Sequence, residues 1–230
     1  MIEVKNLIKN YGKGEVVTRV LRGIDLSIPA GQFVAIMGKS GAGKSTLMYQ
    51  MSLLDQPTSG SVIIDGVITD GFDEKKRTTF RLQKLGYIFQ DYALLPELNA
   101  VENVEVPLLM LGLTNAEARE KATKGLEAVG LGHRLHNRPS QLSGGEQQRV
   151  SIARAIAQKP DILFADEPTA SLDSVSSEDV IRVMRDLHTK GQTIVMVTHE
   201  PEYAAFAERI IMLEDGQVVS DKMQSAKTVV

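Results

Sequence analysis

The feature that most restricts the fold of this chain is a glycine-rich octapeptide, GKSGAGKS, at residues 38–45. It follows the continuously apolar run FVAIM at 33–37 and precedes Leu47, Met48 and Met51, which recur at helical spacing. A strand, a glycine-rich turn and a helix are the context in which the pattern G-x-x-x-x-G-K-[ST] binds phosphate. We therefore expect a parallel sheet with crossover helices and a phosphate-binding turn.

The residue types of this turn suit a bound polyphosphate. Glycine lets the backbone fold tightly, so that successive N–H groups point at phosphate oxygens, and the helix N-terminus adds partial positive charge. Lys44 would supply a full charge to the β- and γ-phosphates, and the Ser45 hydroxyl would coordinate Mg²⁺. The expected nucleotide-binding residues of the turn and the helix start are Gly38, Lys39, Ser40, Gly41, Ala42, Gly43, Lys44, Ser45 and Thr46.

A second apolar strand, predicted at 162–165, ends in the adjacent carboxylates Asp166 and Glu167. An Asp at the carboxyl end of such a strand can hold a metal ion through water. The neighbouring Glu can polarise a water molecule for attack on the γ-phosphorus, whereas a kinase would have to exclude that water. We therefore expect Asp166 to be a metal-site acid and Glu167 to be the general base of a nucleotide-hydrolysing site.

The most specific stretch of the chain is LSGGEQQR at 142–149. Ser143 and Glu146 have the spacing of a capping box, which predicts that a helix begins here. Gly144 and Gly145 at the start of this helix would leave its N–H groups accessible, so we expect a second anion-binding helix start.

The other periodic segments predict strands at both ends of the chain and helices between them. Alternation at 24–28 and the apolar run at 193–197 indicate strands, and Asp65-Gly66 and Asp215-Gly216 predict hairpin turns. A capping box at Thr114 and Glu117 begins a predicted helix within a mainly helical segment at about 90–159. The charged run DEKKR at 73–77 is typical of a solvated helix face.

Composition excludes several functional classes. The 230 residues hold 26 Lys and Arg against 29 Asp and Glu, a net charge of −3, so no nucleic-acid partner is expected. The absence of cysteine excludes disulfides and thiolate metal sites. We expect no signal peptide and find no apolar run of about 18 residues, so any membrane contact is expected to be made through a partner.

The motifs, taken in their order along the chain, resemble those of the ATPase subunit of ATP-binding cassette (ABC) transporters. This resemblance extends over essentially the whole chain. The resemblance implies an α/β P-loop NTPase (RecA-like) core with a mostly parallel sheet, an antiparallel β subdomain and an inserted α-helical subdomain. It implies one nucleotide-binding domain over 1–230, with the RecA-like core and β lobe at about 1–89 and 160–230 and the helical subdomain at about 90–159.

The resemblance also assigns roles to individual residues. Tyr11 would stack on adenine, Gln90 would contact nucleotide and metal, and His199 would join Lys44 and Glu167 as catalytic residues. Asp173 belongs to a predicted D-loop, in which Ser171 stands where close relatives tend to have Gly or Asn. The resemblance implies a Mg²⁺ site formed by Ser45, Gln90 and, through water, Asp166. It also implies that a signature covers the nucleotide of the other subunit. The signature residues are Ser143, Gly144, Gly145 and Glu146, and Glu146 stands where the family often has Gln.

The same family resemblance implies partners. The signature of one subunit would cover ATP held by another in a head-to-tail homodimer that forms on ATP binding. The segment from Gln90 to Val104 resembles the branch serving lipoprotein release, macrolide and peptide efflux and a cell-division complex, which implies a separate transmembrane permease and a location on the cytoplasmic face of the membrane. Leu94, Leu95 and Leu98 would either receive a permease helix or be buried in the helical subdomain.

Two rival hypotheses remain open to test. A soluble ABC ATPase that is not linked to transport is disfavoured by the single cassette, without a coiled-coil insertion or a basic tail. A kinase with the same phosphate-binding turn would leave both the LSGGE segment and Glu167 unexplained. The transported substrate is not encoded in these motifs.

Overall fold

The computed structural model describes residues 1–13 and 16–227. The chain divides into two compact units, unit 1 (Met1–Thr79 with His188–Val230) and unit 2 (Phe80–Leu187). None of the helices in the described ranges combines the length and the apolarity that crossing a membrane requires. The expected boundaries of the helical subdomain, at about 90 and 159, stay a prediction, because unit 2 also includes strands on either side of that segment.

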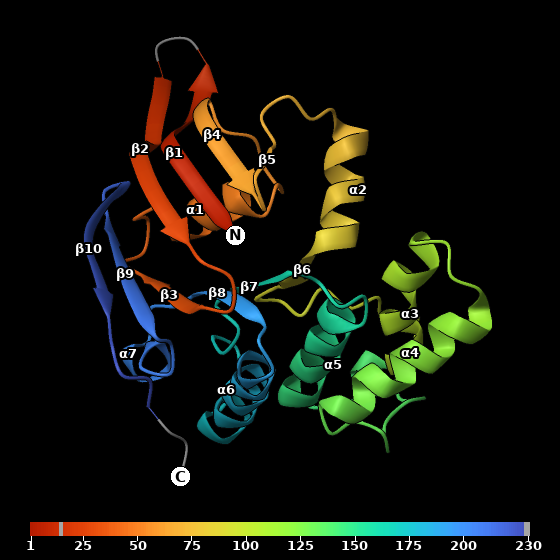
Figure 1. Cartoon of the computed structure of the whole chain (residues 1–230). Helices are drawn as coiled ribbons and strands as arrows, with labels where there is room; N and C mark the ends of the chain where they lie inside the picture. Colours follow the sequence, from red (N-terminus) through yellow and green to blue (C-terminus); the bar gives the residue numbers. More distant parts are fainter. Residues whose placement is uncertain (14–15, 228–230) are drawn as a thin grey trace. The chain divides into compact units, whose positions relative to one another are not determined.

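Unit 1 contains an antiparallel sheet with the strand order β2, β1, β4, β5 (Figure 1). The strands are β2 (Val16–Ile28), β1 (Ile2–Lys13), β4 (Ser59–Ile64) and β5 (Val67–Ile68). The predicted alternation is confirmed, since Ile24, Leu26 and Ile28 are buried while Asp25 and Ser27 are exposed. One face of the sheet therefore supplies part of the core.

Unit 1 also contains strands in the order β10, β9, β3, β8. They are β10 (Gln217–Met223), β9 (Arg209–Glu214), β3 (Phe33–Met37) and β8 (Thr193–Val197). Strand β3 pairs in parallel with both β8 and β9. Every residue of β3 and β8 is buried, as expected for apolar strands covered on both faces. The predicted hairpin turns are confirmed between β4 and β5 and between β9 and β10.

The helices of unit 1 include the one that follows the glycine-rich turn. They are α1 (Lys44–Met51), α2 (Glu74–Lys84), which begins in this unit, and α7 (Pro201–Ala204). The predicted apolar face of α1 is buried at Leu47, Met48 and Met51. The expectation of a solvated face at 73–77 is wrong for Arg77, which is only 6% exposed because its guanidinium donates to the carbonyl oxygens of Leu53 and Asp55.

Unit 2 combines a parallel strand pair with helices. Its strands are β6 (Leu85–Ile88) and β7 (Ile162–Asp166). Its helices are α3 (Ala100–Met110), α4 (Asn115–Ala128), α5 (Gly144–Ile156), the short 3-10 helix η1 (Pro139–Gln141) and α6 (Ser174–Thr189), whose last two residues belong to unit 1. Helices α3, α4 and α5 pack on one another (green in Figure 1). The predicted capping boxes at Thr114 and Ser143 are both present.

Candidate nucleotide-binding site

The glycine-rich turn connects β3 to α1 in a conformation that requires glycine. Gly38 has a φ of 154°, and a Cβ atom there would lie 2.2 Å from the carbonyl oxygen of Leu213. Gly43 caps α1 with a φ of 98°, in the left-handed region. Since side chains at these positions would clash or strain the backbone, the turn keeps its tight curve only with glycine.

Lys44 lies inside this curve. The residue is only 8% exposed, and its ammonium donates to the carbonyl oxygens of Gly38 (2.9 Å) and Lys39 (3.2 Å). Helix α1 begins without a side-chain cap from Gly43 and without an acidic residue in its first turn. Positive charge from Lys44 and from the helix N-terminus therefore converges on the concave side of the turn.

The turn is braced from the neighbouring hairpin. The Gly216 N–H, between β9 and β10, donates to the Ala42 carbonyl at 3.1 Å, and the Arg22 N–H donates to the Gly216 carbonyl at 3.0 Å. Ala42 is buried, whereas Lys39, Ser40 and Gly41 are exposed at the tip. The backbone geometry of the turn is thus fixed by bonds from elsewhere in unit 1, and its tip faces solvent.

Two further predicted residues belong to unit 1. His199 follows β8, whose Val197 is paired with Ile36 of β3, so His199 lies at the same carboxyl edge as Gly38. Tyr11 is 42% exposed, and its side chain is hydrogen-bonded to the Thr46 side chain at the start of α1. Unit 1 therefore places Tyr11 beside the start of α1 and His199 at the strand edge of the turn, and their roles stay predictions.

The carboxylates belong to unit 2. Asp166 ends β7 and is 5% exposed, and Glu167 follows with a φ of 46°. Strand β6 pairs in parallel with β7, with Ile88 opposite Ala165, so the exposed Gln90 lies at the same carboxyl edge as the two acids. Carboxyl edges of parallel strands are where ligands bind in such sheets.

The signature residues form the start of α5. The Ser143 hydroxyl accepts from the Glu146 N–H at 3.3 Å, and the Glu146 carboxylate accepts from the Ser143 N–H at 2.8 Å. This backbone hydrogen bond outweighs burial and, with Arg134, lowers the pKa of Glu146. A Cβ atom at Gly145 would lie 2.8 Å from the Cβ atom of Ser176, so glycine at this position allows the helix start to pack closely against α6.

The predicted D-loop has a structural role as well. Asp173 caps α6, because its carboxylate accepts from the Ser176 N–H (2.9 Å) and from the Ser176 hydroxyl (2.8 Å). These hydrogen bonds lower the pKa of Asp173. Exposed Ser171 offers its carbonyl to the Tyr92 hydroxyl at 3.4 Å, which links the D-loop to the segment after Gln90.

The sequence did not identify two side chains of α5 that support this edge of unit 2. Gln148 is fully buried and donates to the Pro168 carbonyl at 2.8 Å, one residue after Glu167. Arg154 donates to the carbonyls of Tyr92 (2.8 Å) and Ala93, and burial lowers its pKa. Both residues lie within the helical pattern, but nothing in their spacing reveals which distant carbonyl each would reach.

A glycine-rich turn around a lysine ammonium, between a parallel strand and a helix, defines a P-loop nucleotide-binding protein. Comparisons with known proteins narrow this class. The sequence profile of the family described as "ABC transporter" matches residues 21–170. An uncharacterised ABC transporter ATP-binding protein of Methanocaldococcus jannaschii is 51% identical over 219 residues, covering 95% of this chain and 98% of that protein.

Longer relatives and solved structures agree with this match. The macrolide export ATP-binding/permease protein MacB of Marinobacter nauticus is 47% identical over 96% of this chain, which spans 34% of that protein. A dimeric post-hydrolysis structure of the ATP-binding cassette MJ0796, bound to ADP and Pi, has a TM-score of 0.90 and 42% identity, covering 97% of this chain and 98% of that one.

The chain therefore belongs to the ABC transporter family as its ATP-hydrolysing component. The expected fold class, a P-loop NTPase core of mostly parallel strands with an antiparallel sheet and added helices, is confirmed by the structural match and by the elements of both units. The roles of the individual site residues stay predictions, which the contacts above support to different degrees.

Proposed function

We propose that this chain binds Mg-ATP between two head-to-tail copies and couples hydrolysis to the movement of a membrane permease of the export or extraction type. The observation that carries the nucleotide part is the placement of Lys44, whose ammonium lies against the carbonyls of Gly38 and Lys39 inside an uncapped helix start. On binding, triphosphate oxygens would replace these carbonyls as partners of Lys44 and take up the N–H groups of the turn.

The residues expected to hold Mg²⁺ offer suitable donors. Ser45 has a hydroxyl oxygen, Gln90 an amide oxygen and Asp166 a carboxylate at the end of a buried strand, all of which are hard oxygen ligands. Magnesium characteristically keeps several waters and binds one or two protein ligands together with substrate phosphates. Once bound, Mg²⁺ would neutralise charge on the β- and γ-phosphates.

The chain's own groups divide the remaining work. Lys44 holds the phosphates, Glu167 accepts the proton of the attacking water, and His199 acts on the γ-phosphate side at the carboxyl edge of β8. Tyr11 stacks on the base, and Gln90 contacts nucleotide and metal. The signature residues Ser143, Gly144, Gly145 and Glu146 and the D-loop residue Asp173 cover the nucleotide held by the other copy.

The decisive test separates binding from hydrolysis. Lys44→Ala should lose ATP affinity, because it removes the charge that meets the phosphates. Glu167→Gln should keep ATP binding, lose nearly all turnover and accumulate an ATP-dependent dimer in size-exclusion chromatography. Normal turnover by Glu167→Gln would reject Glu167 as the base, and unchanged ATP affinity of Lys44→Ala would reject the phosphate site.

Relatives support both proposed partners. The solved cassette MJ0796, at 42% identity, is a dimer bound to ADP and Pi, and the MacB relatives combine an ATP-binding part with a permease in one chain. Transfer of these properties to this chain predicts a homodimer and a permease, with the ATPase on the cytoplasmic face of the membrane. A cell-division complex of the same branch would use the same geometry.

The leucines that follow Gln90 were expected either to contact a permease helix or to be buried in the helical subdomain, and their exposure supports the first of these alternatives. Leu95 is 45% exposed, and Leu94 and Leu98 are partly exposed rather than buried. The backbone that carries them is rigidly held, because the buried Asn103 amide donates to the carbonyls of Leu95 (3.1 Å) and Leu98 (3.0 Å) and its oxygen accepts from the Leu95 N–H (2.7 Å). Three neighbouring leucines that are at least partly exposed on a held backbone suit contact with an apolar face of a partner helix.

Affinity capture from detergent-solubilised membranes tests the permease. We expect the wild-type chain to retain an integral membrane protein and Leu95→Asp to lose it while ATPase activity persists. The matched control is Met110→Asp, which places the same charge on an exposed apolar residue of the same unit, at the end of α3. Recovery of soluble proteins or nucleic acid alone would favour the soluble ABC ATPase.

A further inference from the structure

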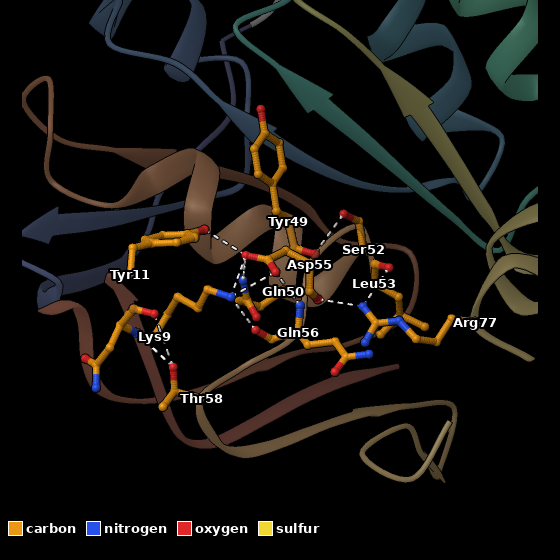
Figure 2. A network of polar contacts seen from close by, with 11 residues as sticks. Lys9, Tyr11, Tyr49, Gln50, Ser52, Leu53, Asp55, Gln56, Thr58 and Arg77 are labelled. Atoms are coloured by element: carbon orange, nitrogen blue, oxygen red, sulfur yellow. Dashed lines mark hydrogen bonds and ion pairs between the residues drawn. The ribbon is translucent and has the colours of Figure 1, made fainter. Parts of the chain in front are cut away.

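The hydroxyl of Tyr11 is tied to a carboxylate that the motifs do not include. It donates to Asp55 at 2.7 Å, and the Lys9 ammonium lies 2.8 Å from the same carboxylate and 4.7 Å from the centre of the Tyr11 ring (Figure 2). Lys9 is 8% exposed, whereas Tyr11 is 42% exposed. A buried ammonium therefore occupies one face of the ring, and the exposed surface of Tyr11 leaves the other face available for stacking.

Asp55 is itself held firmly. Its carboxylate also accepts from the Gln56 N–H (2.7 Å) and from the amide of fully buried Gln50 in α1 (3.0 Å), and its backbone carbonyl accepts from Arg77 (2.7 Å). Four donors thus converge on one carboxylate, and Figure 2 shows them around it. Since α1 begins at the phosphate-binding turn, this network fixes the ring of Tyr11 relative to that turn.

We propose that Asp55 and Lys9 are positioning residues of the nucleotide site, which hold the Tyr11 ring so that its face opposite Lys9 receives the purine base. The inference rests on the proposed ATP site and adds how the base, as distinct from the triphosphate, is held. The tether fixes the ring before ATP arrives, so that no ordering of the side chain has to accompany binding. Lys9 also prevents a base from entering on the wrong face.

The electrostatics of the pair agree with this geometry. Burial and the hydrogen bond to Asp55 raise the pKa of Tyr11 to about 12. Burial alone would raise the pKa of Asp55, but the hydrogen bonds from Lys9, Tyr11, Gln56 and Gln50 outweigh it and lower the pKa to about 2. The phenol therefore stays a donor and the carboxylate an acceptor throughout the physiological pH range.

The test compares ATP with inorganic tripolyphosphate, which lacks the base. Tyr11→Phe removes only the hydroxyl, and Asp55→Asn leaves one acceptor oxygen for four donors. We expect each variant to raise the Kd for ATP about two- to tenfold, the scale of ordering one side chain, with an unchanged Kd for tripolyphosphate. The double variant should bind ATP no more weakly than the weaker-binding single variant, because both substitutions act on the same hydrogen bond between Tyr11 and Asp55. The KM for ATP should rise more than kcat falls.

The matched control is Asp65→Asn, which changes an exposed carboxylate in the β4–β5 turn and should leave both affinities unchanged. Equal loss of ATP and tripolyphosphate binding in Asp55→Asn, or unchanged ATP affinity in Tyr11→Phe, would overturn the proposal. Tyr11→Phe keeps the ring, so it decides the question even if Asp55→Asn unfolds. Failure of the wild-type chain to bind ATP would instead reject the proposed function.

Discussion

At the scale of single residues, Glu167 depends on a side chain from another element. Its φ of 46° lies in the left-handed region, which is unfavourable for a residue with a Cβ atom. The following turn is held by two hydrogen bonds, from Gln148 to the Pro168 carbonyl (2.8 Å) and from the Ala170 N–H to the Glu167 carbonyl (3.1 Å). Gln148 thus stabilises the backbone that aims the proposed general base.

Gln148→Ala should therefore lower both stability and turnover. It leaves the buried Pro168 carbonyl without this donor, a loss of about 1–3 kcal/mol in the free energy of unfolding. We expect kcat to fall with little change in the KM for ATP. The variant would displace Glu167 from its position but would leave Lys44, which holds the phosphates, in place. Denaturant unfolding and steady-state ATPase assays measure the two effects. Gln147→Ala, whose side chain bonds the Leu142 carbonyl instead, is the comparison and should retain kcat.

The pKa values of Tyr11 and Asp55 predict opposite pH limits for their pairing. The pKa of Asp55 is lowered from 3.8 to about 2. The contribution of the ionised carboxylate to the stability of the folded state is therefore complete above about pH 4 and is lost as the pH falls toward 2. The pKa of Tyr11 is raised from 10.0 to about 12, so its stabilisation is complete below pH 10 and is lost as the pH rises toward 12.

A difference titration measures the alkaline limit directly. The ultraviolet absorbance of phenolate, recorded for the protein minus Tyr11→Phe, should show a midpoint near 12. In the Asp55→Asn background, this midpoint should move toward 10, since the acceptor that favours the protonated phenol is weakened. A wild-type midpoint at the ordinary value would contradict the tether.

At the scale of secondary-structure elements, α5 organises the site edge of unit 2. Its first turn carries the signature residues, Gln148 in its middle bonds the turn after Glu167, and Arg154 in its last turn bonds the backbone of Tyr92 and Ala93. Tyr92 and Ala93 have φ values of 59° and 50°, so this backbone needs such support. Helix α5 therefore positions two segments that lie far from it in the sequence and carries the signature at its own start.

Two caps of the same type allow the helix-capping role of the signature serine to be separated from its proposed role in nucleotide binding. Ser143 and Thr114 each form a capping box, at the starts of α5 and α4. Replacement of either by Ala should lower the free energy of unfolding by about 1 kcal/mol, as measured by denaturant titration. Only Ser143→Ala should also weaken the ATP-dependent dimer of Glu167→Gln. If both variants affected dimer formation equally, Ser143 would act only as a helix cap and not at the nucleotide.

At the scale of the whole molecule, ATP should stabilise the fold by mass action. A ligand that binds only the folded state at a concentration 100 times its Kd adds about 2.7 kcal/mol to the free energy of unfolding. Thermal unfolding should therefore shift upward with ATP for the wild-type chain and for Glu167→Gln, but not for Lys44→Ala. A similar shift in Lys44→Ala would mean that ATP stabilises the chain at another site.

Much of the fold follows from local patterns. Continuous apolar runs gave the bounds of β3 and β8, alternation gave the buried face of β2, and the Asp-Gly pairs gave two hairpins. The capping boxes of α4 and α5 were predicted from residues three apart. These features are predictable because the residues that form them are neighbours in the sequence, so that spacing alone determines the contact.

The sequence by itself determined the class of protein and most of the proposed site, because a phosphate-binding turn and a capped helix start are local motifs with fixed spacing. The tertiary structure alone decided which polar side chains hold those motifs in place. Asp55 reaches Tyr11 across 44 positions and Gln148 reaches Pro168 across 20, while Arg77 turns inward from a run that looked solvated. Such partners are chosen by the packing of strands and helices, since only in the folded chain does a buried donor face the acceptor that compensates for its lost water.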